Sequence, residues 1–319
     1  MPAPKIPALA YQLAQRYAPL VMDVTSIRTI AVVGAGQMGS GIAQVCAEKG
    51  YSVLLSDASL ERAVMARERM DELLQKLVMK GKLTAEQREG VLERIEAVEP
   101  HDRIEAADVV VEAATEQPGT KISIFRAADE RMRPEAILAS NTSSISITRL
   151  AGQTNHPERV IGMHFMNPAP LMKLVEIVRG VQTSEQTTRI ASQLAEKLGK
   201  TVITSKDQPG FVVNRMLIPF LNEAVFALQE GLGTPEDIDQ GAKLGLNHPM
   251  GPLELADLIG LDTFLSIAEV LHREFGDDKY RPATLLRNLV AAGWYGRKAG
   301  RGFYVYDDKG QNIGRAFER

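Results

Sequence analysis

The chain has 319 residues, a formal net charge of −3 at pH 7 and a single cysteine. At this length two domains are expected rather than one core. The mildly acidic balance gives no overall attraction to nucleic acid or to a membrane surface, so neither partner is expected. No uninterrupted apolar stretch is long enough to span a bilayer. Cys46 has no partner within the chain, which excludes an internal disulfide and favours a reducing, cytoplasmic location.

Residues 1–26 precede the first predicted strand. The segment from Leu9 to Ala18 could form a short amphipathic helix that Pro19 would end. The segment has too little arginine and serine for a transit peptide, and polar residues interrupt the apolar centre that a signal peptide needs. We interpret residues 1–26 as an N-terminal extension packed on, or fraying from, the domain that follows.

A β-branched run, Thr29 to Val33, leads directly into a glycine-rich turn and a helix-period segment from Ser40 to Lys49. Strand, glycine turn and helix in this order are typical of a dinucleotide-binding fold. Gly34 permits the tight turn, Gly36 leaves room for a pyrophosphate, and Gly39 lets the helix and strand pack closely. The phosphates would lie at the helix N-terminus. The candidate cofactor contacts in this loop are Gly34, Gly36, Gln37, Met38 and Gly39.

The second predicted strand, Ser52 to Ser56, ends in Asp57. An acidic side chain at this place accepts hydrogen bonds from the adenosine ribose hydroxyls and repels a 2′-phosphate. The sequence therefore predicts NAD rather than NADP as the cofactor, and Arg62 could soften that preference.

Residues 58–206 continue as alternating helices and strands. Ala58 to Lys80 is predicted to form a long charged helix, and a second helix begins near Thr84, where Thr84 and Gln87 fit a capping box. This helical hairpin is inserted after the second strand. Further strands are predicted over 108–112, 136–139, 160–164, 174–178 and 201–204, with helices over 121–132 and 184–198. The alternation predicts an α/β fold: a Rossmann-type doubly wound sheet with helices on both faces, over 27–206.

From Asp207 onward the pattern contains helices only. Helices are predicted over 211–228, from Thr234, and over 253–259, 263–275 and 283–292. We therefore expect an all-helical C-terminal domain over 207–319. It carries more apolar residues than a lone small bundle needs, which predicts a two-fold homodimer through these helices.

Polar side chains follow the ends of several predicted strands. In a doubly wound sheet, ligands bind beyond the carboxyl ends of the strands, so Glu116, Ser140–Ser144 and His164 are expected to line one crevice. The hydroxyls and amides there can bind a substrate oxygen or a nicotinamide. Taken alone, Ser140–Ser144 is described equally well as a polar turn.

His164 ends one predicted strand, and Glu176 interrupts the apolar run of the next. A carboxylate in a buried strand is costly unless a cation or donor meets it, and a histidine that becomes positive during turnover would be such a partner. The first hypothesis is therefore an acid–base pair in which His164 takes a proton and Glu176 orients it. The alternative is that Glu176 faces water on an edge strand while His164 is a satisfied core histidine.

Together these features resemble the short-chain L-3-hydroxyacyl-CoA dehydrogenase family, especially the bacterial 3-hydroxybutyryl-CoA dehydrogenases. The resemblance runs from about Ile27 to Tyr306. It rests on the segments GAGQMG, VVEAATE, SNTSSISIT, GMHFMNPAPLMKLVE, KDQPGFVVNR, NHPMGPLELADLIGLD and GRKAGRGFYVY.

The resemblance implies an NAD-dependent, reversible oxidation of (S)-3-hydroxyacyl-CoA, of short chain length, without a metal. It implies that His164 and Glu176 are catalytic, and that Ser143 and Asn214 contact the reacting substrate oxygen. Lys80 would meet the phosphates of coenzyme A. The further cofactor contacts that it implies are Glu116, Lys121, Ser143, Asn167 and Lys298. Two positions depart from the family pattern: Leu73 replaces a serine that often contacts the acyl carrier, and Pro118 lies beside the expected nicotinamide ribose site.

Two other functions remain open. The related L-gulonate dehydrogenase and lambda-crystallin group combines the same domains but acts on free hydroxy acids. A cofactor-binding protein without turnover would keep the fold and lose the chemistry. The β-hydroxyacid dehydrogenases that use a catalytic lysine are disfavoured, because the His164/Glu176 segment has no place in their chemistry.

Overall fold

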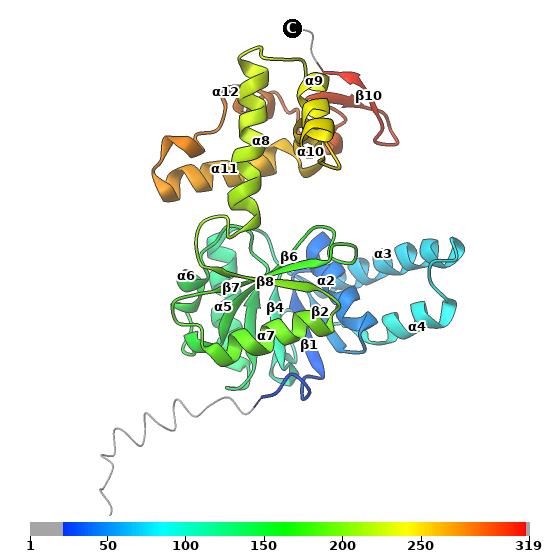
Figure 1. Cartoon of the computed structure of the whole chain (residues 1–319). Helices are drawn as coiled ribbons and strands as arrows, with labels where there is room; N and C mark the ends of the chain where they lie inside the picture. The colour runs from blue at the N-terminus through cyan, green and yellow to red at the C-terminus, as the bar shows by residue number, and fades with distance from the viewer. Residues whose placement is uncertain (1–21, 317–319) are drawn as a thin grey trace, which may run out of the picture. The chain divides into compact units, whose positions relative to one another are not determined.

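The computed structural model describes residues 22–316, so most of the expected N-terminal extension, including its predicted short helix, lies outside the described residues (Figure 1). The chain divides into two compact units between Asp207 and Gln208. That division is one residue beyond the boundary expected after Lys206. None of the described helices combines the length and apolar character needed to cross a membrane.

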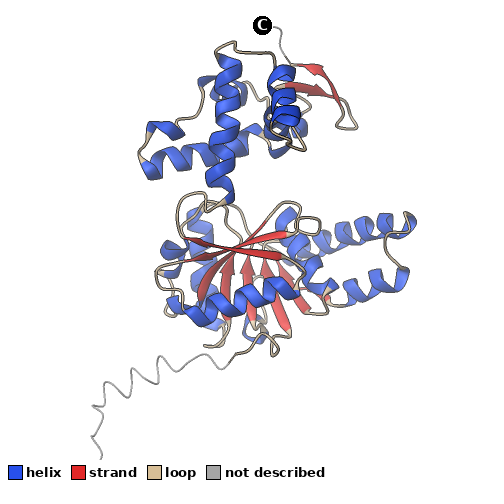
Figure 2. Ribbon diagram, in the orientation of Figure 1, coloured by secondary structure: helices blue, strands red, loops and turns tan. Residues whose placement is uncertain are grey.

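The first unit contains one eight-stranded sheet in the order β3-β2-β1-β4-β5-β6-β7-β8 (Figure 2). Every neighbouring pair is parallel except β6 and β7, which are antiparallel. The mostly parallel, doubly wound sheet is therefore confirmed. The strands are β1 (Thr29–Val33), β2 (Ser52–Ser56), β3 (Ile95–Ala97), β4 (Val109–Glu112), β5 (Ile137–Ser140), β6 (Val160–Phe165), β7 (Leu174–Arg179) and β8 (Thr201–Lys206).

Strand β3 is the one strand of this sheet that the sequence pattern does not predict. It has three residues, of which only Ile95 is fully buried, and it lies at the edge beside β2. A central parallel strand is covered on both faces and forms a continuous apolar run, which a short edge strand does not need. The apolar run that predicts β1 has no counterpart in β3.

Helices cover both faces of the sheet (Figure 2). Buried residues of α2 and α7 join alternate residues of the strands in one core, while α5 packs against β4 and β5 and α6 against β6 and β7. The capping box of Thr84 and Gln87 is present, and it starts the second helix of the predicted hairpin. The helices are α2 (Gln37–Glu48), α3 (Leu60–Met79), α4 (Ala85–Glu93), α5 (Pro118–Arg131), α6 (Ile147–Ala151) and α7 (Glu185–Lys197), with 3₁₀ turns η1 (Ile104–Ala106) and η2 (Pro157–Arg159).

The second unit is mainly helical, as predicted, but it is not all helical. Two short antiparallel strands, β9 (Tyr304–Tyr306) and β10 (Asn312–Arg315), form a hairpin near its end. The helices are α8 (Val213–Gln229), α9 (Pro235–Gln240), α10 (Pro252–Ile259), α11 (Leu261–Phe275) and α12 (Thr284–Ala291), with the π-helical turn η3 (Gly241–Gly245) and the 3₁₀ turns η4 (Asp278–Tyr280) and η5 (Arg297–Ala299).

A buried carboxylate explains why β9 forms. Asp257 in α10 accepts hydrogen bonds from the backbone N–H of Phe303 and Tyr304 and from the hydroxyl of Tyr306. Asp257 is fully buried, and burial raises its pKa to about 6. Because Asp257 and the strand are more than forty residues apart in the chain, local periodicity could not predict this contact.

Candidate functional site

The glycine loop after β1 has the geometry expected of a nucleotide-binding turn. Gly34 has φ +108°, and a Cβ there would lie 2.6 Å from the backbone of Ala113 and Ala114. A Cβ on Gly39 would lie 1.7 Å from the carbonyl oxygen of Gly34. No atom lies within 4 Å of the place where a Cβ of Gly36 would be. Two glycines are therefore required by packing, and the third leaves open space at the loop.

The N-terminus of α2 faces this loop without a side-chain cap. Gly36 is the N-cap residue, and the first turn of α2 contains no acidic residue. By contrast, Ser59, Thr84 and Ser184 cap the helices α3, α4 and α7. Unsatisfied N–H groups at a helix N-terminus bind anions. The loop and helix fit a pyrophosphate group.

Asp57 follows β2 and connects to the same loop. Its carboxylate accepts the N–H of Ala35 at 2.7 Å and of Ala58 at 2.8 Å, and Arg62 Nε lies 2.5 Å from it. Partial burial by itself raises the pKa of Asp57, but these backbone hydrogen bonds and the Arg62 guanidinium outweigh it and lower the pKa. Asp57 is therefore ionised at neutral pH, in the state that accepts ribose hydroxyls, although Arg62 already neutralises part of its charge.

Glu116, which follows β4, organises the polar turn after β5. Its Oε1 accepts hydrogen bonds from the Thr142 hydroxyl at 2.5 Å, from the Ser143 N–H at 2.9 Å and from the Ser144 N–H at 3.0 Å. The Ser143 hydroxyl is 3.2 Å from the same oxygen. Loss of hydration tends to raise the pKa of Glu116, but the Lys121 ammonium and these hydrogen bonds lower it. Ser140–Ser144 is therefore a polar turn held in one shape by a carboxylate.

Lys121, which the resemblance implies as a cofactor contact, forms buried ion pairs in the structure. Its side chain is only 1% exposed, and its ammonium lies 2.7 Å from Glu112, which is fully buried. The ammonium also lies 3.4 Å from Glu116. Burial raises the pKa of Glu112 even though Lys121 opposes this shift. Lys121 thus contacts both the buried carboxylate of Glu112, at the end of β4, and the more exposed carboxylate of Glu116, which holds the turn.

His164 and Glu176 are directly opposite each other in the antiparallel pair β6–β7. His164 Nδ1 lies 2.7 Å from Glu176 Oε2, and Glu176 is fully buried. Strand β7 lies between β6 and β8, so the alternative in which Glu176 faces water from an edge strand is wrong. The predicted contact between the two side chains is confirmed.

The strand order brings these groups together at the carboxyl ends of the parallel strands. Strands β1, β4, β5 and β6 are parallel neighbours, so the glycine loop, Glu116, the turn and His164 all follow or end strands at their carboxyl side. Adjacent strands are about 4.8 Å apart, which puts His164 roughly 14 Å from the glycine loop along the edge. An extended dinucleotide spans such a distance. The strand order also reverses between β1 and β4, where this fold binds ligands.

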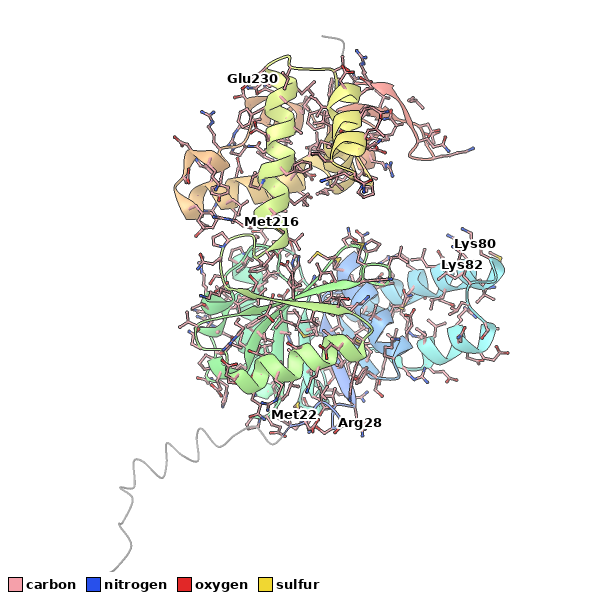
Figure 3. All side chains as sticks on the ribbon, viewed as in Figure 1. Met22, Arg28, Lys80, Lys82, Met216 and Glu230 are labelled. Atoms are coloured by element: carbon pink, nitrogen blue, oxygen red, sulfur yellow. The ribbon has the colours of Figure 1, made fainter. Side chains whose placement is uncertain are left out.

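The remaining predicted residues lie elsewhere along the chain. Asn167 is exposed just beyond β6. Lys80 is exposed at the C-terminal end of α3, and Figure 3 shows it with Lys82 at the turn of the helical hairpin. In the second unit, Asn214 lies in the first turn of α8, and Lys298 pairs with Asp262 at 2.6 Å.

One contributor to the site, Glu112, was missed by sequence reasoning; it anchors Lys121. Asn141 belongs to the predicted Ser140–Ser144 turn, and its side-chain oxygen accepts the N–H of Phe165 at 2.9 Å, which ties the turn to the end of β6. A signal existed for Glu112, since it ends an apolar strand just as Glu176 interrupts one. Among residues 22–316, no group of three or more potential ligands is arranged to hold a metal ion.

Comparison with known proteins agrees with this geometry. Residues 29–208 match the family model described as 3-hydroxyacyl-CoA dehydrogenase, NAD binding domain, and residues 210–306 match the C-terminal domain of the same family. A probable 3-hydroxybutyryl-CoA dehydrogenase of Bacillus subtilis (strain 168) is 52% identical over 283 residues, which are 89% of this chain and 99% of the relative.

Other relatives carry similar names. A probable 3-hydroxybutyryl-CoA dehydrogenase of Deinococcus radiodurans is 54% identical over 275 residues, covering 86% of this chain and 99% of the relative. The crystal structure of (S)-3-hydroxybutyryl-CoA dehydrogenase PaaH1 from Ralstonia eutropha superposes with a TM-score of 0.86 at 52% identity, over 89% of this chain and 100% of that one. The chain therefore belongs to the 3-hydroxyacyl-CoA dehydrogenase family, and its first unit is the NAD-binding domain of that family.

Proposed function

We propose that the protein interconverts (S)-3-hydroxybutyryl-CoA and acetoacetyl-CoA with NAD, with His164 as general base and acid. The observation that carries this proposal is the His164–Glu176 pair, joined at 2.7 Å at the same sheet edge as the glycine loop. The names of the relatives support the acyl-CoA substrate and its short chain. The alternative is a free hydroxy acid as substrate.

Oxidation of a secondary alcohol removes a hydride from carbon and a proton from the hydroxyl. Bound NAD supplies the hydride acceptor. With the Nδ1 proton of His164 directed to Glu176, Nε2 is the nitrogen that takes the hydroxyl proton. Glu176 then holds the imidazolium that forms, and its burial between β6 and β8 keeps this charge–charge contact away from water. In the reducing direction, the same imidazolium returns the proton to the ketone oxygen.

Ser143 is the proposed hydrogen-bond donor to the reacting oxygen. Its backbone N–H donates to Glu116 at 2.9 Å, so the turn is already in place before substrate binds. The hydroxyl, 3.2 Å from the same carboxylate oxygen, has one hydrogen and turns from Glu116 to the substrate oxygen on binding. The roles that the resemblance assigns to Asn214, Asn167 and Lys298 stay predictions.

The two substrate classes are separated by one assay. NADH oxidation is followed at 340 nm with acetoacetyl-CoA and, separately, with acetoacetate, and then with NADPH in place of NADH. We expect kcat/KM to be at least a hundredfold higher for acetoacetyl-CoA, because the carrier provides binding energy that the free acid lacks. A preference for acetoacetate would overturn the proposal in favour of the hydroxy-acid alternative, and no turnover of either would favour a non-catalytic protein.

Lys80 gives a prediction about the carrier. Its ammonium is exposed at the end of α3 and has no ion-pair partner among residues 22–316, which suits a phosphate of coenzyme A. Lys80→Glu is expected to raise the KM for acetoacetyl-CoA about tenfold, because it replaces attraction by repulsion, each worth up to about 1 kcal/mol at an exposed site. The KM for acetoacetyl-pantetheine, which lacks the nucleotide phosphates, is expected to change less than twofold.

Lys82→Glu is the matched control, since it makes the same charge change two residues away on the same hairpin (Figure 3). Phosphate recognition by Lys80 would be dismissed if Lys80→Glu raised the KM equally for acetoacetyl-CoA and acetoacetyl-pantetheine. It would also be dismissed if Lys80→Glu and Lys82→Glu raised the KM for acetoacetyl-CoA equally.

We also propose a cytoplasmic homodimer through the second unit. Much of the apolar content that suggested this dimer forms the core of the unit itself, since Leu221 and Leu253 are fully buried. The apolar side chains that remain exposed there include Met216, Leu232, Leu244 and Leu246. These side chains are the candidates for contact with a second chain. Light scattering that gives the mass of one chain at micromolar concentration would contradict the dimer.

A further inference from the structure

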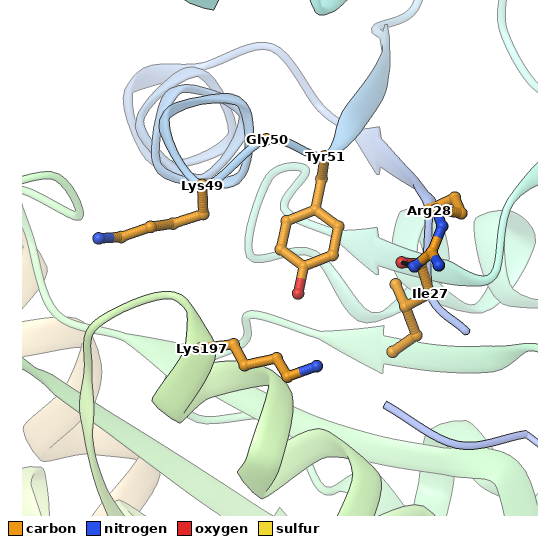
Figure 4. A pocket seen from close by; sticks show the side chains of 6 residues that line it. All are labelled: Ile27, Arg28, Lys49, Gly50, Tyr51 and Lys197. Carbon is orange, nitrogen blue, oxygen red and sulfur yellow. Dashed lines mark hydrogen bonds between the residues drawn. The ribbon is translucent and has the colours of Figure 1, made fainter. Parts of the chain in front are cut away.

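A basic pocket lies in the first unit at the amino ends of β1 and β2, whereas the glycine loop follows the carboxyl end of β1. It has a volume of about 490 Å³ and is lined by Ile27, Arg28, Lys49, Gly50, Tyr51 and Lys197 (Figure 4). Arg28 precedes β1 and Tyr51 precedes β2, whereas the glycine loop follows the other end of β1. The five residues of β1 span roughly 16 Å, so the nucleotide site and this pocket cannot share one ligand group.

The lining has three cations and no carboxylate. Arg28 donates to the carbonyl oxygens of Thr25 at 2.6 Å and Ile27 at 2.9 Å, and Lys197 lies 3.3 Å from the carbonyl oxygen of Val24. These partners are uncharged. Within residues 22–316, none of the three lining cations has an acidic group within ion-pair distance. The Asp108 carboxylate accepts the backbone N–H of Arg28 at 2.7 Å, but it pairs with Arg133 and does not line the pocket.

Helix ends account for part of this charge but not for all of it. Lys49 follows α2 and Lys197 ends α7, and a cation at a helix C-terminus offsets the helix dipole. Each helix end carries the equivalent of about half a negative charge, so two ends offset about one of the three positive charges. A net positive charge remains, which favours an anion. Glu48, next to Lys49, accepts a hydrogen bond from the neutral Gln44 amide and keeps its own charge, but it does not line the pocket.

Tyr51 adds a neutral hydrogen-bond donor. Its ring is buried, and Figure 4 shows its hydroxyl pointing into the pocket between the C-terminal end of α2 and Lys197. Burial raises the pKa of Tyr51, with a further rise from Cys46, so the phenol keeps its proton at neutral pH. Within the described part of the chain, this hydroxyl has no hydrogen-bond partner. Figure 4 shows Lys197 on the side of the Tyr51 hydroxyl, whereas the Lys49 ammonium extends away from the ring. A phenol O–H and an ammonium group are suitable donors for an oxyanion.

We propose that this basic pocket binds a small molecule through a phosphate group, at a site separate from the nucleotide and acyl-CoA sites. The volume lies within the range of ordinary ligand pockets. The N-terminal extension is an unsuitable occupant, because residues 1–22 contain Lys5 and Arg16 and no acidic residue, so their charge has the same sign as that of the pocket. The inference does not depend on the proposed reaction, since it concerns binding alone.

The test is isothermal titration calorimetry of the full chain with inorganic pyrophosphate. Saturating NADH fills the nucleotide site, and the Lys80→Gln background removes the candidate carrier phosphate site. We expect the parent to bind one pyrophosphate per chain. The Lys49→Gln/Lys197→Gln variant is expected to bind pyrophosphate at least tenfold more weakly, because two of three attractive charges are lost. Tyr51→Phe keeps the ring and removes the donor, and is expected to weaken binding roughly threefold to tenfold. Raising the salt concentration should weaken binding further.

Lys173→Gln/Lys206→Gln is the matched control, because it removes the same net charge from exposed lysines of the same unit outside the pocket. Binding should be unchanged in this control, and all variants should keep the thermal midpoint and NADH affinity of the parent. Displacement of pyrophosphate by inorganic phosphate or AMP but not by coenzyme A would support a site separate from that of the carrier, whereas displacement by coenzyme A would overturn that separation. Absence of saturable binding, equal binding by Lys49→Gln/Lys197→Gln, or equal loss in the control would overturn the proposal.

Discussion

His164→Ala is expected to lower kcat for acetoacetyl-CoA reduction by about a hundredfold to ten-thousandfold, the usual contribution of a positioned proton donor. The affinity for NADH should change less than twofold, because His164 lies at the end of β6 whereas the glycine loop follows β1. Stopped-flow absorbance at 340 nm measures the first quantity, and titration of NADH fluorescence measures the second.

Glu176→Gln tests the partner in the same experiment. The amide can still hydrogen-bond the ring but cannot stabilise an imidazolium, so kcat is expected to fall by about a hundredfold or more while the fold is kept. His156→Gln is the matched control, since His156 also contacts a carboxylate, Asp129 at 3.2 Å, but precedes the opposite end of β6. Its activity should stay within twofold of the parent. Near-normal turnover in His164→Ala or Glu176→Gln would remove the proposed acid–base pair.

Lys121→Met is expected to lower the free energy of unfolding of the first unit by about 3–5 kcal/mol, because it leaves a buried carboxylate without its cation. Glu112 is fully buried, and Lys121 is the cation that meets it. The pKa of Glu112 is already raised by burial, and losing Lys121 would raise it further. A raised pKa favours the protonated folded state at low pH, so the loss of stability should be smaller at pH 5 than at pH 8.

Urea denaturation followed by circular dichroism measures this change. Arg179→Met is the control: it breaks the exposed pair with Glu185 in the same unit and should cost less than about 1 kcal/mol. The double variant Glu112→Gln/Lys121→Met should lose less stability than Lys121→Met alone, because no unpaired charge remains buried. If Lys121→Met were no more costly than Arg179→Met, the buried pair would not support the edge of the sheet as described.

Local sequence patterns were sufficient for the parts of the site that depend on short spacing. The glycine loop was readable because strand, turn and helix are contiguous, and the packing around Gly34 and Gly39 confirms why glycine is needed there. The contact of His164 with Glu176 was predicted from the cost of placing a carboxylate in an apolar run. That argument applies equally to Glu112, whose contact with Lys121 was not predicted.

The sequence by itself determined the order of most elements of the first unit, the nucleotide loop and the residue types capable of proton transfer, because these depend on periodicity and on neighbours within a few residues. The tertiary structure alone decided that β7 is an interior strand, that Glu116 holds the Ser140–Ser144 turn, and that β9 is tied to Asp257. Each of these depends on backbone pairing or hydrogen bonds between residues distant in the chain. Such contacts leave no periodic signal in either partner, since a polar side chain looks the same in sequence whether it faces water or a buried donor.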